Sequence, residues 1–123
     1  MRTPLVNPII IELKVKTPVR QVRAHFSTAI SSPSEWFKWD DVIYDKDGLP
    51  IKASLTYWEH GSERKLKTVE FSDRDFANGL QAFLRVQGTG LTVQYTSDGE
   101  WDIDAEGADS IMQYAIYDDI IMS

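Results

Sequence analysis

The sequence changes from a strand pattern to a helix pattern within residues 66–88, LKTVEFSDRDFANGLQAFLRVQG. Ser72 is followed three residues later by Asp75, which approximates a capping box with Asp in place of the usual Glu. Phe71 and Phe76 stand on either side of this cap, at the spacing of a hydrophobic staple. We therefore predict that a strand ends at Phe71 and that a helix begins directly after Ser72.

The predicted helix carries apolar residues at the three- and four-residue spacing of a single buried face. These residues are Phe76, Leu80, Phe83 and Leu84. Gly88 follows them, and glycine is favoured just past a helix end because it tolerates the left-handed backbone conformation found there.

Upstream of this helix, the sequence indicates three further strands. Segments 9–15 and 51–58 alternate between apolar and polar residues, and segment 36–44 is rich in aromatic residues. Turn-forming residues fill 45–48 and 60–62. We expect the two later strands, together with the strand that precedes the helix, to form an antiparallel meander.

An earlier helix is expected between the first two strands. Thr17 and Pro18 are typical of a helix start, since a Thr side chain can cap and Pro needs no amide partner there. The apolar stripe that follows consists of Val19, Val22, Phe26, Ala29 and Ile30. Residues 31–34, Ser-Ser-Pro-Ser, are expected to end this helix.

The last third of the chain predicts a strand, a third helix and a final strand. Residues 91–95 alternate, and residues 105–116 carry apolar residues at helical spacing. Asp102 or Asp104 is expected to cap this helix. Residues 120–122 are most simply interpreted as a short strand.

The element order is therefore β-α-β-β-β-α-β-α-β. It predicts a single α+β domain over residues 1–123, with three helices and a mainly antiparallel sheet of about five to six strands. With 42% hydrophobic residues, a chain of this length can bury a core without disulfides, and it has no Cys. The longest aliphatic run, 9–11, is far shorter than the roughly 20 residues of a membrane span, so we expect no membrane partner.

Negative charge is concentrated at the C-terminal end. The chain has 13 Lys and Arg against 19 Asp and Glu, a net charge of −6. Residues 98–123 contain eight acidic residues and no Lys or Arg, so this segment alone exceeds the net charge of the chain. Because acidic surfaces repel phosphate backbones, we expect no direct nucleic-acid binding. A protein partner with a basic surface, including one that normally holds nucleic acid, is expected instead.

Catalytic residue types are scarce. His25 falls in the first predicted helix beside Phe26, which favours a partly exposed helical side chain over a general base. His60 precedes Gly61 and Ser62 in a predicted turn, where a nucleophile–base pair with Ser62 is the alternative. A turn tip neither orients a base nor excludes water, so we expect no enzymatic activity and no cofactor.

The acidic segment has an alternative interpretation as a calcium loop. Asp102, Asp104, Glu106 and Gly107 would then stand at loop positions one, three, five and six. Gln113 occupies position twelve, where a bidentate Glu is expected. The helical spacing of the segment favours a helix with a solvated acidic face, and an acidic interaction surface is the other alternative. No metal is expected.

Two further sets of side chains have alternative interpretations. Trp36, Trp39 and Trp58, with Phe37 and Tyr57, either pack in the core or form an aromatic patch on the sheet face away from the helices. Basic residues either lie as solvated surface charges or form an anion pocket. The basic set is Lys14, Lys16, Arg20, Arg23, Lys65 and Lys67.

Three stretches carry a resemblance to other proteins. They are TAI at 28–30 leading to Trp36, FANGL at 76–80 following Phe71-Ser72, and the end of the chain, with AD at 108–109, QYAIY at 113–117 and DDIIMS at 118–123. In these stretches the chain resembles a widespread family of small uncharacterised bacteriophage and prophage proteins. It departs from the family where Ser32 and Pro33 replace a Gly-Gly pair and where Asp118 and Ser123 replace glycines. A ligand role of the Gly-Gly turn would therefore not carry over.

The resemblance implies a phage accessory protein that acts by binding in the host cytoplasm. We expect an inhibitor of a host defence protein, for example a CRISPR effector. The expected contact residues are Asp98, Glu100, Asp102, Asp104, Glu106, Trp36, Trp39 and Trp58. The alternative is a sponge that sequesters a signalling nucleotide, with aromatic rings stacking on the base and Lys or Arg holding phosphate. Homo-oligomers are compatible with either function.

Overall fold

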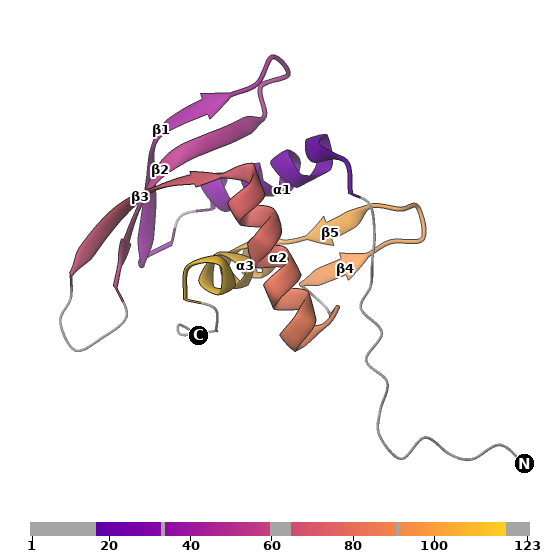
Figure 1. Ribbon diagram of the computed structural model, residues 1–123. Helices are drawn as coiled ribbons and strands as arrows, with labels where there is room; N and C mark the ends of the chain where they lie inside the picture. The colour runs from indigo at the N-terminus through magenta and orange to yellow at the C-terminus, as the bar shows by residue number, and fades with distance from the viewer. Residues whose placement is uncertain (1–16, 33, 60–64, 91, 118–123) are drawn as a thin grey trace, which may run out of the picture.

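The computed structural model describes residues 17–32, 34–59, 65–90 and 92–117. Within them the chain forms three helices and five strands (Figure 1). In chain order these are α1 (Val19–Ser31), β1 (Phe37–Tyr44), β2 (Pro50–Trp58), β3 (Leu66–Ser72), α2 (Asp73–Gln87), β4 (Val93–Tyr95), β5 (Trp101–Ile103) and α3 (Ala105–Tyr117). The strand predicted over 9–15, the turn over 60–62 and the strand over 120–122 lie outside the described residues.

The first three strands form the predicted antiparallel meander, in the order β1-β2-β3. Leu55 of β2 lies opposite Trp39 of β1 and Val69 of β3, and it is fully buried. α1 and α2 both pack against this sheet. β1 becomes irregular near its end, where Asp41 has a φ of 53° and the pairing with β2 is interrupted until Ile43. Such an irregularity locally bends a strand and increases its twist.

The start of α2 is built as the sequence predicts. The Ser72 hydroxyl accepts a hydrogen bond from the Asp75 amide at 3.3 Å, and the Asp75 carboxylate accepts one from the Ser72 amide at 2.9 Å. Phe71 and Phe76 are both buried, and both rings contact Phe26 of α1. The capping box therefore fixes where β3 becomes α2, and the flanking rings hold α1 against this junction.

α2 and α3 pack closely because α2 carries Gly79 at their contact. A Cβ atom at this position would lie 2.7 Å from both the Cβ of Ala115 and the carbonyl oxygen of Ile111, so a larger residue would push the helices apart. The ring of Phe83 meets Tyr114 edge-on across the same contact, with centroids 5.7 Å apart. The two helices thus form a layer between the three-stranded sheet and the β4–β5 hairpin (Figure 1).

The sheet prediction is wrong in one respect, because the strands form two sheets rather than one. β4 pairs with β5 in a separate antiparallel hairpin. This hairpin lies on the other side of α2 and α3 from the three-stranded sheet (Figure 1). β5 itself was not predicted, since its three residues lie within a run of acids and alternation over three positions does not distinguish a strand from a turn.

The start of α1 also differs from the prediction. Pro18 occupies the N-cap position, and no side chain caps the helix there. The Thr17 hydroxyl, which was expected to cap, instead accepts a hydrogen bond from the indole nitrogen of Trp101 at 2.9 Å. A buried indole N–H needs an acceptor, whereas amides at an exposed helix start can be satisfied by water.

A single hydrophobic cluster includes buried residues from all eight elements. The described residues therefore share one core, which confirms the α+β class. None of their helices combines the length and the apolar composition that crossing a membrane requires.

Candidate acidic interface

Five acidic residues follow one another at every second position from the β4–β5 turn to the first turn of α3. This acidic strip consists of Asp98, Glu100, Asp102, Asp104 and Glu106, and all five residues are exposed. The intervening Trp101 and Ile103 are each only 6% exposed. Because successive side chains of a strand point to opposite faces, β5 buries its apolar residues and turns its acid toward solvent.

The tip of the hairpin is a tight turn held by backbone hydrogen bonds. The Thr96 amide donates to the Glu100 carbonyl at 2.7 Å, and the Gly99 amide donates to the Thr96 carbonyl at 3.1 Å. Gly99 has a φ of 82°, a left-handed conformation that glycine adopts without strain. The turn therefore gives the first two acids of the strip a defined backbone.

Side chains of α1 and of the residue before its N-cap anchor β5 through contacts with Trp101. The Gln21 side-chain oxygen accepts a hydrogen bond from the Trp101 amide, and Thr17 accepts one from the Trp101 indole. His25 also interacts with the Trp101 backbone. Gln21 and His25 are four residues apart, which places them on one side of α1, and Thr17 directly precedes the N-cap of this helix. On the hairpin itself, the Trp101 ring packs against Tyr95 with centroids 4.9 Å apart.

His25 links α1 to the acidic strip electrostatically. Burial is the largest influence on its imidazole and lowers its pKa from the ordinary 6.5. The Trp101 backbone and the negative charges of Asp102 and Glu100 act in the opposite direction but do not cancel the effect of burial. The side chain is therefore uncharged at neutral pH, and the strip keeps its negative charge uncompensated by this histidine.

Two acids of the strip also stabilise the start of α3. Asp104 accepts a hydrogen bond from the Gly107 amide at 2.7 Å, so Asp104 rather than Asp102 caps this helix. Glu106 lies in the first turn, where the helix dipole favours a negative charge. In the described part of the chain, the carboxylates of Asp98, Glu100 and Asp102 accept no hydrogen bond.

Among the described residues, no Lys or Arg is fixed beside the strip by an ion pair. None of its acids forms an ion pair with Lys or Arg within the described residues. The ion pairs of Arg23 and Lys52 lie on the side of the three-stranded sheet, with Asp45, Asp73 and Glu70. Like charges along an anchored backbone produce a locally negative potential that attracts cations.

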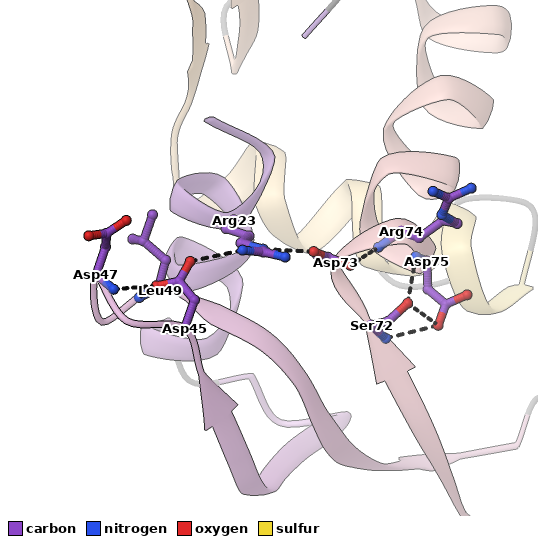
Figure 2. Close-up of polar contacts among 8 residues, drawn as sticks. All are labelled: Arg23, Asp45, Asp47, Leu49, Ser72, Asp73, Arg74 and Asp75. Carbon is purple, nitrogen blue, oxygen red and sulfur yellow. Dashed lines mark hydrogen bonds and ion pairs between the residues drawn. The ribbon is translucent and has the colours of Figure 1, made fainter. Parts of the chain in front are cut away.

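In contrast to the acidic strip, the charges are paired where α1 meets the β1–β2 turn and α2 (Figure 2). Arg23 of α1 contacts Asp45 at 3.0 Å and Asp73 at 2.8 Å. Asp45 also accepts backbone hydrogen bonds from Asp47 at 2.8 Å and from Leu49 at 3.0 Å. The Leu49 amide, followed by Arg23, lowers the pKa of Asp45 despite the opposing effect of burial. One cation thus connects three segments of the chain.

This network bears on the predicted anion pocket. The Arg23 guanidinium is engaged by two carboxylates, which raise its pKa, Asp73 more than Asp45. Lys14 and Lys16 lie outside the described residues. The described part of the structure therefore gives no support to a phosphate pocket that includes Arg23.

The tryptophans predicted as contacts belong to the three-stranded sheet and its approach, whereas the strip runs from the β4–β5 turn to the first turn of α3. Trp36 is 6% exposed, and its indole nitrogen donates to Asp109 at 2.7 Å. Trp39 is half-buried and meets the ring of Phe26 edge-on. Trp58, also half-buried, ends β2. Trp36 belongs to the hydrophobic core and Trp39 and Trp58 pack against it, which agrees with the core-packing interpretation of these side chains.

The calcium interpretation does not fit the structure. Asp102 lies on β5, whereas Glu106 and Gly107 are in α3, so the segment does not form one metal-wrapping loop. The described residues contain no group of three or more His, Asp or Glu side chains placed to hold a metal ion. The alternative pair of His60 and Ser62 lies outside them.

Sequence reasoning missed the role of Trp101. The pattern in the sequence that indicates a buried Trp101 is a large apolar residue between acids, followed two positions later by Ile103. A second signal is the four-residue spacing of Thr17, Gln21 and His25. Neither pattern reveals by itself that the two segments, about 80 residues apart, meet in the fold.

Comparisons with protein-family models, with curated proteins and with solved structures found no match for this chain.

Proposed function

We propose that this protein acts by binding, and that the acidic strip contacts a basic surface on a partner protein. The observation that supports the proposal is a row of exposed acids without Lys or Arg partners in the described structure, on a backbone anchored through Trp101. Neighbouring like charges repel one another, so a cationic partner gains free energy by relieving that repulsion.

The spacing of the acids suits a partner that normally holds nucleic acid. Alternate residues on a strand lie roughly 6.6 to 6.8 Å apart. Asp102 lies on β5, and Glu100 and Asp104 directly flank this strand, so the three acids follow one another at about this interval. Nucleic-acid-binding surfaces use Lys and Arg to neutralise regularly spaced phosphates. A row of carboxylates on such a surface would occupy the cations that nucleic acid needs.

The resemblance to phage and prophage proteins adds the biological expectation. We propose that the partner is a host defence protein, such as a CRISPR effector, and that binding in the host cytoplasm inhibits it by excluding its nucleic acid. The nucleotide-sponge alternative receives no comparable support. Arg23 is already engaged by aspartates, and Trp36 is buried in the core.

Affinity purification from a bacterial host lysate tests the proposal. The tagged wild-type protein is compared with a variant that combines Asp98→Lys, Glu100→Lys and Asp102→Lys. These three acids have no capping role, so the variant is expected to fold. The control combines Glu35→Lys, Asp40→Lys and Glu59→Lys, which produces the same change of net charge on exposed acids outside the strip.

We expect the wild type and the control to retain a stoichiometric host protein that the strip variant loses. Added nucleic acid should displace that protein. Equal retention by both variants would contradict the role of the strip. A bound small molecule without a protein partner, detected by native mass spectrometry, would favour the sponge instead.

A further inference from the structure

The β1–β2 turn at 45–49 and the β4–β5 turn at 96–100 share the same backbone hydrogen bonds. In both, the amide of the first residue donates to the carbonyl of the fifth at 2.7 Å. The amide of the fourth residue donates to the carbonyl of the first at 3.1 Å. This fourth residue is a left-handed glycine, Gly48 with a φ of 81° and Gly99 with a φ of 82°. An exposed Asp precedes each glycine, so the two turns form a matched pair of Asp–Gly sites.

The side chain at the first position holds the β1–β2 turn firmly. One carboxylate oxygen of Asp45 accepts hydrogen bonds from the Asp47 amide at 2.8 Å and from the Leu49 amide at 3.0 Å. The other oxygen contacts Arg23 at 3.0 Å (Figure 2). A short Asp side chain that bonds the amide two residues later stabilises a turn of this kind.

The β4–β5 turn has a weaker group at the same position. The Thr96 hydroxyl accepts a hydrogen bond from the Glu100 amide at 3.3 Å. Within the described residues, no side chain accepts one from the Asp98 amide, which corresponds to the bonded amide of Asp47. Fewer hydrogen bonds therefore oppose the opening of this turn.

We propose that Asp98 is a site of spontaneous isoaspartate formation and that it is modified faster than Asp47. The backbone nitrogen of Gly99 attacks the side-chain carbon Cγ of the protonated Asp98 carboxyl group, and a C–N bond forms. The side-chain hydroxyl leaves with the amide proton as water, which produces a five-membered succinimide. Water then opens the ring at either carbonyl and gives aspartate or isoaspartate. The inference does not rest on the proposed function.

The turn controls this reaction because it holds the attacking amide. While the turn is closed, the Gly99 amide donates to the Thr96 carbonyl and is not free to approach Cγ. The Gly48 amide is held in the same way by the Asp45 carbonyl. The reaction therefore proceeds from the open turn, and local openings are more frequent where fewer hydrogen bonds must break.

Isoaspartate at this position would alter the tip of the hairpin without changing its charge. The modified residue keeps one carboxylate, but the main chain then runs through the former side chain and is longer by one carbon atom. A longer main chain cannot keep both backbone hydrogen bonds of the turn. The acidic strip, which begins at Asp98, would thus change in shape at this end.

Prolonged incubation of the folded protein at pH 6 and 37 °C tests the proposal. Chromatography separates the peptides of successive samples, and electron-transfer fragmentation distinguishes isoaspartate from aspartate of the same mass. The chain unfolded in urea gives the intrinsic rate at each site. After division by that rate, we expect Asp98 to be modified about fivefold faster than Asp47, the size expected when one fewer hydrogen bond opposes opening.

Exchange of the first residue between the turns provides matched variants. Thr96→Asp gives the second turn the side chain of the first and should slow the modification of Asp98. Thr96→Glu adds the same charge on a longer side chain and should not slow it. Asp45→Thr should accelerate the modification of Asp47, and the rate at Asp98 in the same variant reports any general loosening of the fold.

Equal normalised rates at the two sites of the wild type, or faster modification of Asp47, would overturn the proposal. It would also be overturned if Thr96→Asp were modified as fast as the wild type, because the first side chain would then not control opening. Isoaspartate that forms in urea but at neither site of the folded chain would overturn it as well. Hydrogen exchange provides a second readout, in which the Gly99 amide should exchange faster than the Gly48 amide.

Discussion

The three-stranded sheet and the β4–β5 hairpin are held in place by different means. β1, β2 and β3 have seven to nine residues each, whereas β4 and β5 have three. Arg23 and Lys52 form ion pairs beside the sheet, whereas within the described residues the acids of the hairpin form none. The hairpin depends instead on the burial of Trp101 and its neutral hydrogen bonds to Thr17 and Gln21. Ion pairs thus contribute to the contacts of α1 with the sheet side, whereas neutral contacts hold the hairpin against α1.

The largest effect is expected from Trp101→Ala. Removing a buried tryptophan should lower the free energy of unfolding by about 3–5 kcal/mol, and the hairpin has no other residue with the same contacts. Trp58→Ala, at a half-buried position of the longer sheet, should cost less. Urea unfolding of both variants measures the difference. Equal losses would mean that the hairpin does not depend on this one side chain.

The next effect is expected from Arg23→Gln, which leaves Asp45 and Asp73 without their cation. The free energy of unfolding should fall at neutral pH, because both carboxylates remain close together. The exposed Arg74 provides the control, since Arg74→Gln should change stability much less. If both substitutions have the same effect, the network in Figure 2 does not stabilise the fold.

Acid titration sharpens this prediction. The folded-state pKa of Asp45 lies below its ordinary 3.8, so the folded protein binds fewer protons there than the unfolded chain does. Its stabilising contribution is therefore complete above about pH 4 and is lost as the pH falls through the lowered pKa. Arg23→Gln should reduce this acid-dependent loss, which urea unfolding from pH 5 to pH 2 would detect.

A smaller pH dependence is expected from His25. Its folded-state pKa lies below 6.5, so the contribution of neutral His25 is complete above pH 6.5. It is lost as the pH falls through the lowered value, and the free energy of unfolding decreases. His25→Gln should remove this step from a pH series of unfolding experiments, whereas His60→Gln should leave it in place. A step that survives His25→Gln must originate from another group.

The smallest effect on stability is expected from neutralising the strip. The combination of Glu100→Gln and Asp102→Asn should change the free energy of unfolding by no more than about 0.5 kcal/mol, as for exposed sites without partners. Asp45→Asn is a similar chemical change near the three-stranded sheet and should destabilise more, because Asp45 holds two amides and a guanidinium. Urea unfolding compares the two variants directly. The reverse order would contradict the contrast between the two regions.

Local patterns in the sequence predicted most of the fold. The capping box at Ser72 and Asp75 satisfies its own amides, so it could be recognised without knowledge of the rest of the chain. The long alternating strands of the meander were equally recognisable. β5 was not, because three residues carry too little periodicity and its burial depends on α1, far away in sequence. For the same reason, the separation of the strands into two sheets could not be predicted from the sequence.

The candidate interface was only partly predictable for a related reason. The sequence identifies the acids of the strip, but it does not distinguish Asp102, which is exposed, from Asp45, which is engaged. The difference lies in Arg23, which is 22 residues from Asp45 in sequence and 50 from Asp73. Likewise, the burial of Trp36 depends on distant partners such as Asp109. Residue type indicates which interactions a side chain can make, whereas tertiary contacts determine whether it is buried, paired or available to a partner.

The hydrogen bond from the Trp101 amide to Gln21 has a consequence for aggregation. An open strand edge offers amides and carbonyls to any strand that arrives, which is how sheets of separate molecules join. Along the outer edge of β5, the amide of Trp101 is taken by a helix side chain that cannot be extended by a further strand. α1 therefore blocks this amide against strand pairing, and conditions that loosen the start of α1 would make it available to a strand of another molecule.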